Sequence, residues 1–164
     1  MTADTDPIAP ETTDLPESLA EIVTDFAETD AGDRLQLLLE FSSELPDVPE
    51  RYADHPELLE AVPECQSPIF LVTEVDNAEA GEEATVHLHF SAPPEAPTTR
   101  GFAGILHEGL DGQNAGVVLA IPADLPLRLS MTEIVSPLRL RGMSGMLARI
   151  QRQVAERIGK ITAN

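Results

Sequence analysis

The strand-like part of this sequence is confined to its middle, in two short runs at residues 69–75 and 84–91. The first run is rich in β-branched side chains, and the second alternates apolar and polar residues, as a half-buried strand does. Its apolar face consists of Val86, Leu88 and Phe90. The segment between the two runs contains asparagine and glycine, which favour turns. We therefore predict an antiparallel hairpin, with a third strand that is short or comes from the segment before Cys65.

Helical periodicity occupies the chain on both sides of the hairpin. Apolar residues recur every three or four positions, which predicts amphipathic helices at residues 16–28, 31–45 and 139–159. Shorter helices are expected at residues 57–61, 98–110 and 114–120, and another within residues 125–135. The sequence thus predicts an α+β fold in which a small antiparallel sheet packs against helices. Residues 1–14 are polar and acidic, so we expect a disordered tail before one domain at residues 15–162.

Cys65 is the single cysteine of the chain, and it lies between Pro63 and Pro68. Each proline lacks an amide hydrogen and favours extended geometry in the residue before it, so the thiol is expected on a loop. One cysteine cannot form an internal disulfide, and alone it cannot supply a four-thiolate metal site. It can carry a group covalently on sulfur if some thiolate forms, or it can be a small buried apolar side chain.

The formal net charge of −19 argues against nucleic-acid binding and against anionic membrane surfaces, because both need a basic face. No apolar run approaches the length of a membrane span. The first residues are acidic where a signal peptide would be positive, so we expect a cytoplasmic protein. Most basic residues follow Leu125, which predicts ion pairs between an acidic N-terminal half and a basic C-terminal helix.

The segment Glu64-Cys65-Gln66-Ser67, followed by Ile69-Phe70-Leu71-Val72, resembles the cysteine loop and first strand of the SufE family of sulfur acceptors. A second block, Val135-Ser136-Pro137-Leu138-Arg139-Leu140-Arg141-Gly142-Met143, resembles the family's Leu-(Ser/Thr)-Pro-x-Arg-x-x-Gly-(Leu/Met) segment before its closing helix. The resemblance covers about residues 15 to 160. One departure is Glu64, which stands where the family has glycine and makes the loop more acidic.

The resemblance implies a SufE/IscU-like fold and a function in iron–sulfur cluster assembly. Cys65 would take a persulfide sulfur from a SufS-like cysteine desulfurase, stimulate that enzyme and pass the sulfur to an assembly scaffold. Gln66, Ser67 and Arg139 are the implied binding residues, with side chains of the first two holding the loop. No metal or resident cofactor is implied, only a transient persulfide. The protein would be a sulfurtransferase-like carrier, monomeric or weakly dimeric, and whether it is called an enzyme is a matter of definition.

Several details of such a site follow as expectations. An apolar pocket lined by Phe70, Ile105 or Met143 would shelter the persulfide. Arg139 would steady a sulfur anion, or it would form a salt bridge to the acidic half. Gly142 is expected to permit close packing. The remaining arginines of the last helix, Arg149, Arg152 and Arg157, are expected mostly on its outer side.

Alternative functions remain open at this point. The chain could be an acidic protein-binding module or a desulfurase regulator in which Cys65 is structural. A cluster scaffold would need several thiolate ligands, which one cysteine does not provide. His87 and His89 share a strand face and could bind a metal, although a solvated face is the simpler interpretation. A cysteine protease would need His55 or His107 beside the thiol.

Overall fold

The computed structural model describes residues 12–161, which form an α+β fold as predicted. The helices are α1 (Glu17–Glu28), α2 (Ala31–Glu44), α3 (Glu50–Ala53), α4 (Pro97–Leu110), α5 (Ala115–Leu119) and α6 (Pro137–Arg157). The strands are β1 (Glu60–Ala61), β2 (Phe70–Asp76) and β3 (Thr85–Ser91). Short 3₁₀ turns are η1 (Pro56–Leu58), η2 (Pro63–Cys65), η3 (Ala78–Glu83) and η4 (Leu125–Leu129).

The three strands form one antiparallel sheet in the order β1-β2-β3. In the hairpin, Leu71 lies opposite Phe90 and Thr73 lies opposite Leu88, so these side chains share the buried face. The third strand is β1, a two-residue strand directly before the cysteine loop, as expected. The hairpin and the origin of the third strand are therefore confirmed.

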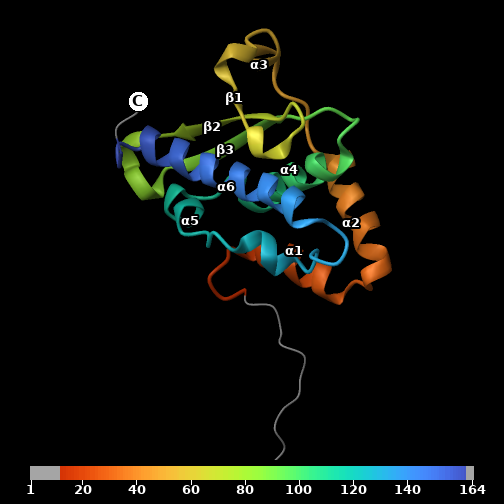
Figure 1. The fold of residues 1–164 in the computed structure, drawn as a ribbon. Helices are drawn as coiled ribbons and strands as arrows, with labels where there is room; N and C mark the ends of the chain where they lie inside the picture. Colours follow the sequence, from red (N-terminus) through yellow and green to blue (C-terminus); the bar gives the residue numbers. More distant parts are fainter. Residues whose placement is uncertain (1–11, 162–164) are drawn as a thin grey trace, which may run out of the picture.

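The helices other than α3 form layers on the buried face of the sheet (Figure 1). α6 runs along β2, and α4 lies between the sheet and the helices α1 and α2. Glycines allow α4 to approach its neighbours: a Cβ atom added to Gly101 would lie 2.7 Å from the Leu38 carbonyl oxygen, and one on Gly109 would lie 2.7 Å from Leu19 Cδ1. The glycines weaken α4 as an isolated helix but permit the close packing that stabilises it.

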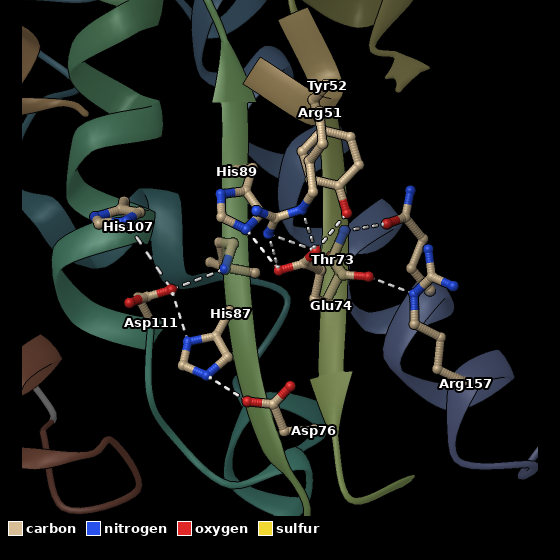
Figure 2. A network of polar contacts seen from close by, with 12 residues as sticks. Arg51, Tyr52, Thr73, Glu74, Asp76, His87, His89, His107, Asp111 and Arg157 are labelled. Atoms are coloured by element: carbon tan, nitrogen blue, oxygen red, sulfur yellow. Dashed lines mark hydrogen bonds and ion pairs between the residues drawn. The ribbon is translucent and has the colours of Figure 1, made fainter. Parts of the chain in front are cut away.

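Beyond β1, helix α6 covers the free edge of β2 (Figure 2). The Gln153 side-chain oxygen accepts a hydrogen bond from the Thr73 amide at 2.7 Å, and the Arg157 guanidinium donates to the Thr73 carbonyl. Arg157 was expected on the outer side of α6 and is instead a cap on the sheet edge. Side chains of α6 thus satisfy strand groups that no neighbouring strand reaches, which fixes the helix against the sheet.

Differences from the sequence prediction are local. The short helix expected within residues 125–135 is the 3₁₀ helix η4, whereas the one expected at 57–61 is split into η1 and β1. α3 was not predicted. Residues 1–11 of the predicted tail lie outside the described residues, whereas Asp14 is ordered and pairs with Arg128 at 2.8 Å. Among the described helices, none has both the length and the apolar character needed to cross a bilayer.

Candidate functional site

The cysteine loop is held by its own backbone. Cys65 is the last residue of η2, and its amide donates to the Val62 carbonyl at 3.1 Å. Gln66 then adopts a left-handed conformation with φ of 58°, which is uncommon outside glycine and turns the chain sharply. The Ile69 amide donates to the Ser67 carbonyl at 2.7 Å, which closes the loop. Within residues 12–161 neither the Gln66 nor the Ser67 side chain forms a hydrogen bond, so the expectation that these side chains hold the loop is wrong.

Two glycines of α6 make room for the loop. A Cβ atom on Gly142 would lie 3.0 Å from the Cys65 Sγ atom, and one on Gly145 would lie 2.9 Å from the Glu64 carboxyl carbon. The Cys65 thiol donates a weak hydrogen bond to the Gly142 carbonyl at 3.6 Å. The expected packing role of Gly142 is confirmed. Because Gly142 and Gly145 are three residues apart, they lie on one side of the helix and form a notch that receives Glu64 and Cys65.

A cavity of about 270 Å³ lies at this contact between loop and helix. It brings together the four residues that the sequence singled out, Cys65, Gln66, Ser67 and Arg139. The remaining lining residues are Glu64, Ser136 and Leu138. The lining is mostly polar, so the expected apolar pocket is wrong. Ile105 and Met143 are fully buried in the core, and Phe70 lies on the strand beyond the loop.

The thiol is neutral in this arrangement. Burial and the nearby charge of Glu64 raise the pKa of Cys65 to about 12, and the positive charge of Arg149 only partly offsets them. A thiolate is the reactive form of cysteine, so these surroundings hold Cys65 in its less reactive form. A movement of the loop or a new positive charge near the sulfur would favour the thiolate.

Arg149 is part of the site although the sequence analysis placed it outside. Its Nη1 atom lies 2.8 Å from Glu64 Oε2, and its Nε atom lies 3.3 Å from Glu60 Oε2. The signal was present in the spacing: Gly142, Gly145 and Arg149 are separated by three and four residues and therefore share one face. Arg152 also pairs with Glu60, so the predicted pairing of acidic and basic halves is confirmed.

Arg139 contrasts with the other arginines near the loop. It lines the cavity from the first turn of α6, where the Ser136 hydroxyl caps the helix by accepting from the Arg139 amide at 3.3 Å. Its guanidinium is exposed and forms neither an ion pair nor a hydrogen bond with any residue in 12–161. The alternative of a salt bridge to the acidic half is therefore wrong. The guanidinium at the cavity that Cys65 also lines is therefore available to an anion.

The histidines are engaged elsewhere, as Figure 2 shows for three of them. His89 contacts Glu74 at 2.8 Å, and His87 contacts Asp76 at 3.0 Å. In the part of the chain that the structure describes, no group of three acidic, histidine or cysteine side chains is arranged to hold a metal ion. His55 and His107 pair with Glu57 and Asp111, and the Cys65 thiol bonds to a carbonyl, so the protease arrangement is absent from these residues.

Comparison with known proteins gives consistent results. The family model of SufE, an Fe–S metabolism associated domain, matches residues 20–154. Two uncharacterized SufE-like proteins of Mycobacterium tuberculosis, from strains CDC 1551 and H37Rv, are each 54% identical over 142 residues, which covers 87% of this chain and 94% of the relative. The solution structure of a hypothetical protein from Thermus thermophilus matches with a TM-score of 0.75 and 34% identity, over 88% of this chain and 98% of that one.

Proposed function

Because the chain belongs to the SufE family, whose domain is associated with Fe–S metabolism, we propose that it is a sulfur acceptor with Cys65 as its acceptor residue. The observation that carries this proposal is the position of the single cysteine. It stands on a tightly turned loop, and the unpaired guanidinium of Arg139 lines the same cavity. A structural cysteine needs neither a sharply turned loop nor a free cation at the same cavity.

The proposed reaction moves one sulfur atom without net oxidation. The Cys65 thiolate attacks the outer sulfur of a cysteine persulfide on the donor. A new S–S bond forms on Cys65, the donor's S–S bond breaks, and the donor cysteine leaves as a thiolate. The proton lost from Cys65 balances the one that the donor thiolate takes up. The sulfur is cargo in this scheme, and no resident cofactor is involved.

The residues around Cys65 support distinct parts of this reaction. The raised pKa of Cys65 keeps the thiol unreactive toward stray disulfides until a donor arrives. Arg139 can pair with the sulfur anion or with a donor carboxylate, because a guanidinium offers several donors in a fixed plane. Gln66 and Ser67 line the cavity with side chains that have no partner among residues 12–161, so they can bond to the donor peptide.

The partners follow from the same chemistry. The donor is a cysteine desulfurase, and the recipient is an iron–sulfur assembly scaffold. A lone unbridged cysteine fits the reducing cytoplasm, where persulfide transfer is possible without competing disulfide formation. The protein would stimulate the desulfurase by removing its persulfide after each turnover.

The test is the intact mass of the protein after incubation with a cysteine desulfurase and cysteine, without reductant. We expect a gain of one sulfur atom in the natural protein and no gain in Cys65→Ser. An active desulfurase that leaves the mass unchanged would overturn the proposal. A sulfur gain that persists in Cys65→Ser would also overturn it, because the acceptor would then be another group.

A second candidate is a binding module or desulfurase regulator in which Cys65 is structural. It is favoured by the fit of the neutral thiol into the notch made by Gly142. The two functions differ in one measurement. Cys65→Ser abolishes stimulation of the desulfurase if Cys65 is the acceptor, and leaves the stimulation intact if the protein acts by binding alone.

A further inference from the structure

Glu64 and Glu60 contact the same arginine but are held very differently. Glu60 pairs with Arg152 as well as Arg149 and accepts a hydrogen bond from the Gln153 side chain at 2.9 Å. The only ion pair of Glu64 among the described residues is the one with Arg149, and the Glu64 side chain is 40% exposed. Glu60 is thus fixed within a network, whereas Arg149 is the only side chain among the described residues that holds the Glu64 carboxylate, besides a hydrogen bond to its own backbone.

Arg149 is also placed to change partners. Its side chain is 21% exposed, and it is anchored to α6 by a hydrogen bond from Nη1 to the Gly145 carbonyl at 3.2 Å. Its Nε–H is buried without a hydrogen bond, although Glu60 lies 3.3 Å away. One guanidinium donor, the Nε–H beside Glu60, is therefore not used in a hydrogen bond. In this arrangement the positive charge of Arg149 already acts to lower the pKa of the Cys65 thiol.

We propose that the Glu64–Arg149 ion pair is a latch on the cysteine loop, and that Arg149 is a positioning residue that turns from Glu64 to the sulfur anion of Cys65 when Glu64 is drawn away. The inference rests on the proposed function and assigns a role that the acceptor chemistry alone does not require. Glu64 restrains the thiol in two ways, by its own negative charge and by occupying the guanidinium. Releasing Glu64 removes both restraints at once.

The latch also predicts which charged group the donor surface must carry. Drawing an exposed carboxylate from an arginine requires a competing cation, so the donor surface beside its persulfide should carry a lysine or arginine. Such a cation pairs with Glu64, and the freed Arg149 then stabilises the thiolate that attacks. Activation is thereby tied to docking, and the free protein keeps a protonated thiol.

The test compares Glu64→Gln, Arg149→Gln and the double variant by the rate at which iodoacetamide alkylates Cys65, from pH 7 to pH 10. Glu64→Gln should alkylate ~3- to 10-fold faster at pH 8, because losing a nearby negative charge lowers the pKa of a thiol. Arg149→Gln should alkylate more slowly than the natural protein, since it loses the cation and keeps Glu64. The double variant should lose most of the rate increase that Glu64→Gln alone produces. Adding Arg149→Lys to Glu64→Gln, in place of Arg149→Gln, should restore the faster alkylation.

A matched control is Glu82→Gln, which removes one carboxylate from the exposed pair with Lys160 far from the loop, and it should leave the rate unchanged. Arg139→Gln belongs in the series because Arg139 is the cation that lines the cavity, whereas Arg149 reaches the loop through Glu64. Equal acceleration in Glu64→Gln and Arg149→Gln would overturn the proposal, because it would mean that breaking the pair only loosens the loop. No acceleration in Glu64→Gln would overturn it as well.

The alkylation series needs no desulfurase, so its outcome is independent of the sulfur-transfer test. Opposite effects of the two substitutions without any sulfur gain would keep the latch and reject the acceptor function. Sulfur gain with no opposite effects would keep the acceptor function and reject the latch. With a desulfurase present, Glu64→Gln should also raise the KM for the acceptor, because the carboxylate that recognises the donor's cation is lost.

Discussion

Cys65 packs so closely against Gly142 that the cysteine fits there only because residue 142 has no side chain. A Cβ atom on Gly142 would lie 3.0 Å from the Cys65 Sγ atom and 3.2 Å from its Cα atom. The second distance involves backbone, so rotating the cysteine side chain cannot relieve the contact. The position of the thiol against α6 is therefore fixed by a glycine rather than by a hydrogen-bonding side chain.

The first prediction concerns Gly142→Ala. The methyl group should push the loop out of its notch, at a cost of about 1–3 kcal/mol that outweighs the ~1 kcal/mol gained from the better helix former. Urea unfolding should show a net loss of stability, and iodoacetamide should reach Cys65 faster. Gly32→Ala is the matched control, because nothing lies within 4 Å of its Cβ position, and this helical substitution should stabilise the protein. A stabilised Gly142→Ala with unchanged alkylation would contradict the packing argument.

The second prediction concerns stability at high pH. The folded state raises the pKa of Cys65 to about 12 from its ordinary value of 9.0, so the unfolded chain releases this proton first. The contribution of the neutral thiol to stability is complete below about pH 9 and is lost as pH rises toward about 12. The free energy of unfolding, measured in urea at pH 7 and pH 10, should fall more in the natural protein than in Cys65→Ser. An equal fall in both proteins would show that Cys65 ionises alike in the folded and unfolded chains.

The third prediction concerns Glu74 on the outer face of the sheet (Figure 2). Burial alone would raise the pKa of Glu74, but hydrogen bonds from Tyr52, Arg51 and His89 outweigh burial and lower it to about 2. A lowered pKa stabilises the fold above the ordinary value of 4.5, and this contribution is lost as pH falls toward 2. Glu74→Gln should cost about 1–2 kcal/mol at pH 6, after discounting for partial exposure. The difference from the natural protein should shrink toward pH 2.5 in urea titrations, and a constant difference would argue against the ionised network.

Periodicity and turn chemistry were enough to predict the hairpin and the main helices. Val86, Leu88 and Phe90 alternate along one strand, and the sequence shows this directly. The short helix α3 was harder to predict, because it is too short for a periodic signal and depends on contacts with distant residues. The sheet edge was also hidden, since Arg157 and Gln153 reach Thr73 only after the chain has folded.

For the site as well, residues in local sequence motifs could be predicted, whereas contacts between distant residues could not. Family motifs in the sequence pointed to Cys65, Gln66, Ser67 and Arg139, and the structure places these residues around one cavity. Arg149 was assigned to the outside because apolar residues such as Met146 and Ile150 mark the inner face of the helix. The packing of Glu64 against Gly145 decides its direction, and no local pattern reports a contact across that distance. The polar lining of the cavity was missed because Ile105 and Met143 were needed for the core instead.

The fourth prediction compares Arg100, which builds the fold, with Arg139, which has no partner among residues 12–161. Arg100 donates to the carbonyls of Ala92, Leu45 and Ser42, so it joins the end of β3 to the end of α2. Removing it leaves partly buried carbonyls unpaired, and Arg100→Ala should cost about 2–3 kcal/mol. Arg139→Ala should change the stability by less than about 0.5 kcal/mol, because the guanidinium is exposed and has no partner within residues 12–161.

Arg139→Ala and Arg100→Ala should also differ in how well they stimulate the desulfurase. Arg139→Ala should fold normally and still lower desulfurase stimulation, measured as sulfide released per minute with the acceptor in excess. A single charge-assisted hydrogen bond to the sulfur anion predicts about a 10-fold loss or more. Arg100→Ala, assayed below its unfolding temperature, should stimulate normally because it does not reach the cavity. Full stimulation by Arg139→Ala would remove this arginine from the site and leave Arg149 as the cation that supports the sulfur.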